Sequence, residues 1–130
     1  NRQKLRETMA SSPLTPIKSY GKNKADEAFL NRITEIIDAH ITNVDFSVDD
    51  LAQEIAMSRS NLYRKLKGLS GLTPNDFIRL VRLKKAVKLM QDGETRINEI
   101  CFMVGFNTSS YFAKCFKSQF GILPKDFVRK

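Results

Sequence analysis

Tryptophan is absent from this chain of 130 residues, and cysteine and histidine are scarce, with two and one residues respectively. Cys101 and Cys115 lie far apart without a paired motif, which argues against a disulfide scaffold and favours a reducing cytoplasm. A single histidine, His40, is a poor candidate for a metal site, because such sites need several ligands. Because no cluster of His, Cys, Asp and Glu is visible either, we predict no metal, no cofactor and no enzymatic activity.

Long apolar runs are also missing. No run reaches the roughly 18 apolar residues that a membrane-spanning helix needs. Neither an initiator Met nor a signal-peptide pattern begins the chain, so we expect a piece of a longer protein. Residues 1–24 show no sustained period and carry two prolines, which predicts a flexible linker before a folded domain at residues 25–130.

The whole chain has a net charge of +8, and its acidic residues are few outside one block. Residues 25–56 hold eight acids and one arginine, whereas residues 57–92 hold nine basic residues and two acids. A basic body of this kind favours a polyanionic partner, most simply nucleic acid. An ordinary solvated helical surface explains the charge alone equally well.

The spacing of the apolar residues predicts about seven helices and no strand, an all-α fold. Candidate N-caps are Ser47, Ser58, Thr73, Thr95 and Thr108. Pro74 begins the longest helix, at about residues 74–91, and Pro124 begins a short last one.

A repeat organises these helices. The phrase GLTPNDFIR at residues 71–79 recurs as GILPKDFVR at residues 121–129, and the residues before each copy also match, at offsets of 49 and then 50. Each copy follows a short helix, a tight turn and a second helix, which is the plan of a helix-turn-helix. We place these units at about residues 47–70 and 95–120. At about 1.5 Å per residue, the bridging helix is about 27 Å long. With its flanking turns it can hold two recognition helices about 34 Å apart, one turn of B-DNA.

The second helix of each unit leaves a polar face free once its apolar positions turn inward. These inward positions are Leu62 and Leu66 in one unit and Phe112 and Phe116 in the other. The free face has hydrogen-bonding groups near the helix start and cations further along, as a recognition helix in a major groove requires. The residues predicted to contact DNA are Arg59, Ser60, Asn61, Tyr63, Arg64, Lys67, Ser109, Ser110, Ala113, Lys114 and Lys117.

Other residues have plainer predicted roles. The phenylalanine stripe is predicted to be core: Phe102, Phe106, Phe112, Phe116, Phe120 and Phe127. Both cysteines are expected to be buried small residues. Lys84, Lys85 and Lys88 are expected to be solvated, and Arg82 is left open between a DNA contact and a solvated charge. Gly105 stands where the turn calls for positive φ, a position that Ala56 occupies in the first unit.

The stretch INEICFMVGFNTSSYFAKCFKSQFGILPKDFVR is similar to the signature of the AraC/XylS family of bacterial transcription regulators, and the resemblance extends from about Phe46 to Arg129. It implies two helix-turn-helix subdomains bridged by a long helix. It also carries the family's base contacts over onto Arg59, Ser60, Tyr63, Arg64, Ser109, Ser110, Ala113 and Lys114. Ala113 can offer only a methyl contact.

A second phrase, SRSNLYRKLKGLSGLTPNDFIRLVRLKKA, resembles output domains of hybrid two-component sensors of Bacteroidetes. That setting implies a receiver or sensor domain upstream, RNA polymerase as a partner and a location inside the cell, even where the full-length protein is anchored in a membrane.

The leading hypothesis is therefore a sequence-specific binding domain for double-stranded promoter DNA, with no small-molecule ligand in this fragment. The alternative is a basic helical module that binds an acidic protein.

Overall fold

The computed structural model describes residues 13, 17 and 22–128, and within them the chain forms seven helices and no strand. The helices are α2 (Lys24–Ala39), α3 (Val48–Ile55), α4 (Arg59–Ser70), α5 (Pro74–Gln91), α6 (Ile97–Met103), α7 (Ser109–Phe120) and α8 (Pro124–Val128). The predicted all-α fold is confirmed. Most of the predicted linker at residues 1–24 lies outside the described residues, as does Arg129.

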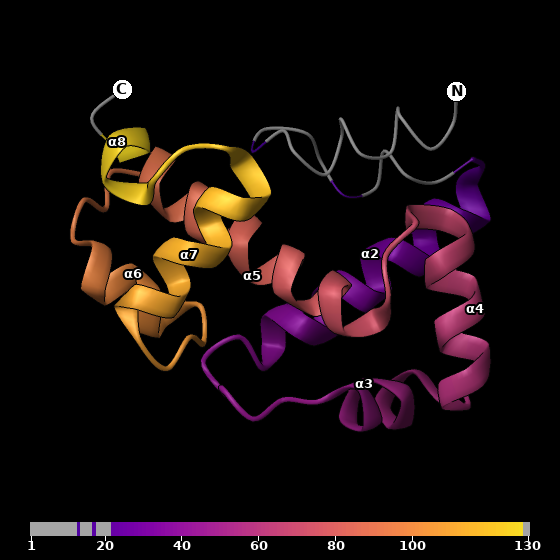
Figure 1. Cartoon of the computed structure of the whole chain (residues 1–130). Coiled ribbons are helices and arrows are strands. Elements are labelled where there is room, and N and C mark those ends of the chain that lie inside the picture. The colour runs from indigo at the N-terminus through magenta and orange to yellow at the C-terminus, as the bar shows by residue number, and fades with distance from the viewer. Residues whose placement is uncertain (1–12, 14–16, 18–21, 129–130) are drawn as a thin grey trace.

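Helix α5 runs through the middle of the molecule and joins its two halves (Figure 1). Its first part, including Phe77 and Leu80, is buried in a core shared with α2, α3 and α4. Its second part, including Leu83 and Ala86, is buried in a second core formed with α6 and α7. One 18-residue helix therefore belongs to both cores and carries the two helix-turn-helix units.

Side-chain caps set most of the helix starts. Ser47 and Asp50 form a capping box at α3, and Ser58, Thr73 and Thr108 each accept a backbone N–H in the first turn of the helix that follows. Gly71 and Gly121 end α4 and α7 in the left-handed conformation, with φ of 79° and 77°. These features agree with the sequence reading.

The predicted cap at Thr95 is wrong. The N-cap position of α6 is Arg96, and no side chain caps this helix. Glu94 bonds to the chain just before the helix, since its Oε1 accepts the backbone N–H of Arg96 at 2.9 Å. The helix begins at Ile97, one residue later than a cap at Thr95 would give.

The phenylalanine prediction holds for Phe106, Phe112 and Phe116, which are buried, and in part for Phe120 and Phe127, which are half-buried against the same core. It fails for Phe102, which is 57% exposed. The rings of Phe112 and Phe116 lie 5.8 Å apart in the second core, and Phe106, Phe120 and Phe127 pack against them. Helix α6 is only seven residues long and buries Ile100 and Cys101. Phe102 follows Cys101 by about 100° around the helix and so leaves the buried face.

Candidate nucleic-acid interface

The first recognition helix, α4, presents a continuous polar face. Leu62 and Leu66 are fully buried, because residues four apart share one face of a helix. The six predicted contact residues of this helix are all exposed: Arg59, Ser60, Asn61, Tyr63, Arg64 and Lys67. Tyr63 is 46% exposed, and Arg64 donates to the side-chain oxygen of Asn61. The face therefore combines donors, acceptors and an aromatic ring.

The second recognition helix, α7, has a smaller and less charged face. Ser110, Lys114 and Lys117 are exposed, while Ser109 and Ala113 are half-buried. Tyr111 is 49% exposed on the same helix, and the sequence analysis missed it. The repeat itself carried the signal, because an offset of 50 pairs Tyr111 with Asn61, which was included.

The two units hold the start of their recognition helices in the same way. In the first, Nε of Arg59 lies 3.0 Å from Oδ1 of Asp49 on α3. In the second, the hydroxyl of Ser109 donates to Oδ1 of Asn98 on α6 at 2.5 Å. Asp49 and Asn98 occupy corresponding repeat positions, and so do Arg59 and Ser109. The contact is thus preserved while its chemistry changes from an exposed ion pair to a neutral hydrogen bond.

Two grooves lie beside these helices. The larger, of about 680 Å³, is lined by Val48, Arg59, Ser60, Tyr63, Arg64, Pro74 and Asn75. The smaller, of about 240 Å³, is lined by Val44, Asn75, Ile78, Arg79, Arg82, Gly105, Phe106, Asn107 and Tyr111. Asn75, at the start of α5, borders both. One groove therefore borders the exposed face of α4, the other borders the start of α7, and Asn75 lies between them.

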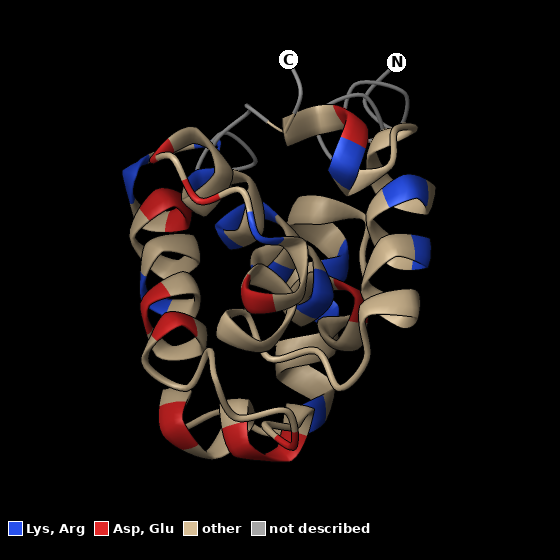
Figure 2. Cartoon of the chain, turned by 90° about the vertical axis from the view of Figure 1, so that its left-hand side faces the viewer, with Lys and Arg blue, Asp and Glu red and all other residues tan. Residues whose placement is uncertain are grey.

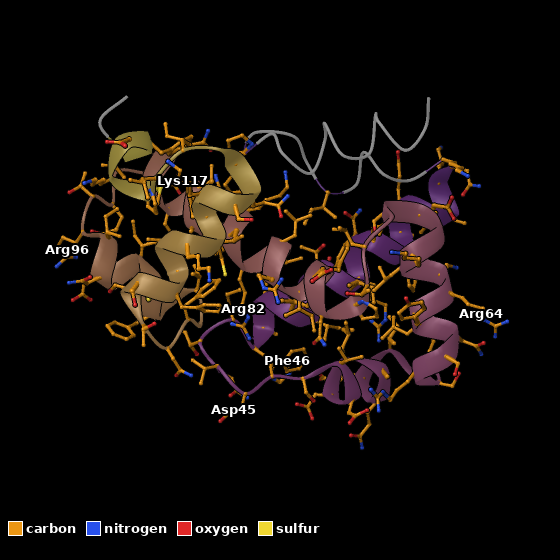
Figure 3. The ribbon with its side chains drawn as sticks, viewed as in Figure 1. Asp45, Phe46, Arg64, Arg82, Arg96 and Lys117 are labelled. Atoms are coloured by element: carbon orange, nitrogen blue, oxygen red, sulfur yellow. The ribbon has the colours of Figure 1, made fainter. Side chains whose placement is uncertain are left out.

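Charge is divided between the sides of the molecule. In Figure 2 the acidic residues lie mostly along α2 and at the bottom of the view, whereas the basic residues lie mostly in the middle and on the side of α7. Figure 3 shows Arg64 pointing outward from α4 in one half and Lys117 on α7 in the other half. Such a distribution suits a polyanion that contacts the recognition helices and avoids α2.

For Arg82 the sequence did not decide between a DNA contact and a solvated charge. The side chain is instead buried at the junction of the two halves. It is 6% exposed, and burial lowers its pKa. It donates to the carbonyl oxygens of Ile41, Asn43 and Val104 at 2.7, 2.8 and 2.9 Å. Arg82 is thus part of the framework between the units.

Three further side chains differ from expectation. Lys84 is not simply solvated, since it is partly buried and burial lowers its pKa to about 8. Lys85 is also partly buried, and only Lys88 of the three lysines is exposed. Cys101 is buried as predicted, and burial raises its pKa, but Cys115 is only partly buried.

Neither a metal centre nor a membrane span is found in the part of the chain that the structure describes. No group of three His, Cys, Asp or Glu residues within it is placed to hold a metal ion. No helix there is both long and apolar enough to cross a bilayer. His40 instead stacks on Phe46, with ring centroids 4.5 Å apart, and its Nε2 lies 2.7 Å from Oε2 of Glu54.

Known proteins share this arrangement. A regulator from Chromobacterium violaceum, described as an AraC-type DNA-binding domain-containing protein, superposes with a TM-score of 0.72 at 26% identity, covering 82% of this chain and 95% of that one. The family model described as a helix-turn-helix domain matches residues 51–130. The chain belongs to the AraC/XylS family. In this AraC/XylS chain the match spans both units from Leu51 onward.

Two relatives of the AraC/XylS domain extend the similarity upstream of α3. The C-terminal domain of AraT, a response regulator from Geobacillus stearothermophilus, is 27% identical with a TM-score of 0.65, covering 91% of this chain and 88% of that one. Histidine kinase P4 of Formosa agariphila is 31% identical over all 130 residues. This chain spans only 10% of that kinase.

Proposed function

We propose that this domain binds a specific double-stranded DNA site in a promoter, with α4 and α7 in successive major-groove segments. The observation that carries the proposal is the repeated recognition helix, which buries its apolar stripe and leaves hydrogen-bonding side chains exposed in both units. Membership in the AraC/XylS family supports the same function. Because the exposed faces of α4 and α7 differ, the DNA site is expected to be asymmetric.

The predicted contacts divide by chemistry. Arg64, Asn61 and Lys114 carry groups that pair with base edges, and Lys67 and Lys117 reach phosphates from the later turns. Tyr63 and Tyr111 add exposed rings that can contact thymine methyl groups or sugars. Ala113 offers a methyl group alone. The proposal assigns no catalytic role to any of these residues.

In the full-length protein, we infer that a receiver or sensor domain precedes this domain and controls it inside the cell. Support comes from the similarity to the C-terminal domain of a response regulator and to a histidine kinase of which this chain spans one tenth. RNA polymerase is the partner expected of a promoter-bound regulator.

The test is selection of duplexes from a random library on the purified domain, followed by titration of the recovered site. The expected result is a site bound at least about 1,000-fold more tightly than random duplex at physiological salt. Affinity for either duplex should fall as salt rises, because each phosphate contact releases a counterion.

The alternative of a protein-binding module makes a different prediction. A basic module for an acidic partner would bind every duplex alike, or none. Equal affinity for the recovered site and for random duplex would therefore contradict the proposed function. Heparin competition serves as the control for purely electrostatic binding.

A further inference from the structure

The boundary between the two cores falls within α5, between Val81 and Leu83. Val81 belongs to the first core and Leu83 to the second. Arg82 stands between them in the sequence and is buried at the same junction, as Figure 3 shows near the middle of the molecule. A buried guanidinium is costly to desolvate, and no carboxylate among the described residues pairs with it. Its place in the fold therefore calls for a specific role.

The bonds of Arg82 join segments from both halves. Its Nη1 donates to Ile41 of the loop after α2 and to Val104 at the end of α6, at 2.7 and 2.9 Å. Its Nη2 donates to Asn43 of that same loop at 2.8 Å. Val104 is the C-cap of α6, where free carbonyl groups and the helix dipole favour a cation. A planar fork with fixed donor directions sets the position of these carbonyls more strictly than apolar packing alone.

Gly105 shows how closely the second unit approaches this arginine. A Cβ built on Gly105 would lie 1.7 Å from Nη1 of Arg82 and 2.3 Å from the carbonyl oxygen of Ile41. Its φ of 84° is also one that glycine adopts readily. The turn of the second unit thus meets the loop of the first unit and the guanidinium in one small space.

We propose that Arg82 fixes the relative placement of the two recognition helices and so sets the spacing between the two DNA segments that the domain accepts. Arg82 acts as a positioning residue and touches no base. This inference rests on the proposed function, because spacing has meaning only for a site read by both units. Helix α5 supplies the rough separation, and the three bonds of Arg82 remove rotation about the junction.

The test uses the duplex recovered by selection, together with versions carrying one or two base pairs inserted at its centre and versions keeping only one half. Each inserted base pair adds about 3.4 Å and turns the second half by about 35°. The protein variants are Arg82→Lys and Arg82→Met. Their matched controls, Lys88→Arg and Lys88→Met, exchange one cationic side chain for another or remove the charge at an exposed position of α5.

The unchanged protein should lose about 10- to 100-fold in affinity on insertion, because two linked units then cannot engage together. In Arg82→Lys this loss should shrink to less than about 3-fold, and the original duplex should bind about 10-fold more weakly. Binding to single halves should stay within about 2-fold of the unchanged protein, which a general loss of folding would not allow. The Lys88 variants should keep the full insertion penalty.

Two results would overturn the inference while leaving DNA reading intact. In the first, the unchanged protein binds its selected duplex specifically but loses no affinity when base pairs are inserted. In the second, Arg82→Lys folds and loses as much affinity on insertion as the unchanged protein. If the unchanged protein prefers no duplex at all, the proposed function itself fails.

A distance measurement covers the case in which the Arg82 variants do not fold. Spin labels at Ser60→Cys and Ser110→Cys, in a Cys115→Ala background, report the separation of α4 and α7 in the free protein. A single narrow distribution is expected. A broad one would contradict a fixed junction.

Discussion

The two helix-turn-helix units share the same arrangement of helices but differ in the side chains of their cores and exposed faces. The first packs leucines, with Leu62 and Leu66 fully buried, whereas the second packs a cluster of phenylalanine rings around Phe112 and Phe116. Both recognition helices expose a tyrosine, but the first adds two arginines and an asparagine, whereas the second adds Ser110 and two lysines. The two units therefore share a backbone geometry, while their side chains differ both in the core and on the exposed face of the recognition helix.

The turns show why the two units have different residues at one corresponding position. Ala56 and Gly105 occupy corresponding positions, and both have positive φ, 58° and 84°. Ala56 is exposed, so its methyl group meets no steric conflict and only the strain of the left-handed conformation remains. Gly105 lies against Arg82, where no Cβ fits. The same backbone turn tolerates alanine in one unit and requires glycine in the other.

The largest expected effect concerns the cores. Phe112→Ala should lower the free energy of unfolding by about 3–5 kcal/mol, and Leu62→Ala at the corresponding position by about 2–5 kcal/mol, because each leaves a cavity. Chemical denaturation followed by circular dichroism measures both. A Phe112→Ala protein as stable as the parent would refute the assignment of that face of α7 to the core.

Substitutions in the two turns should differ in the size of their effect on stability. Gly105→Ala is expected to cost about 2–5 kcal/mol, combining overpacking against Arg82 with the strain of positive φ. Ala56→Gly should change stability by no more than about 1 kcal/mol, since relief of strain is offset by backbone entropy. Denaturation of the two single variants decides the matter. An equal loss of stability in the two variants would mean that contact with Arg82 is not what distinguishes the two turns.

The helix starts offer the smallest contrast. Ser47→Ala removes a capping box and should cost about 1 kcal/mol. Thr95→Ala removes a hydroxyl that makes no cap bond, and its effect should stay within about 0.5 kcal/mol. Thermal melts of the pair test this. A loss of stability in Thr95→Ala as large as that in Ser47→Ala would show that Thr95 caps α6, as the sequence predicted.

The sequence predicted the parts of the fold that depend on local chemistry and on the repeat. Ser47, Thr73 and Gly121 mark helix ends through short-range hydrogen bonds and backbone preference, so their roles can be read from neighbours in the chain. Helix α5 was predicted at residues 74–91 and found at Pro74–Gln91.

What the sequence could not supply depends on contacts between distant segments. Arg82 was left open because its acceptors, Ile41 and Val104, lie 41 and 22 residues away. Phe102 was wrongly assigned to the core, because apolar spacing alone does not show how much of a short helix is covered by neighbouring elements. The predicted contact residues follow from register within each unit, because exposure on a helix is set by spacing from its buried positions.

The most direct test of the two-unit account compares Arg64→Ala with Lys114→Ala on the selected duplex, with every base pair substituted in turn. Each variant should lose preference worth about 1–3 kcal/mol at a few positions. The account predicts that the positions affected by Arg64→Ala lie in one half of the site and those affected by Lys114→Ala in the other. Loss of preference at the same base pairs in both variants would contradict it.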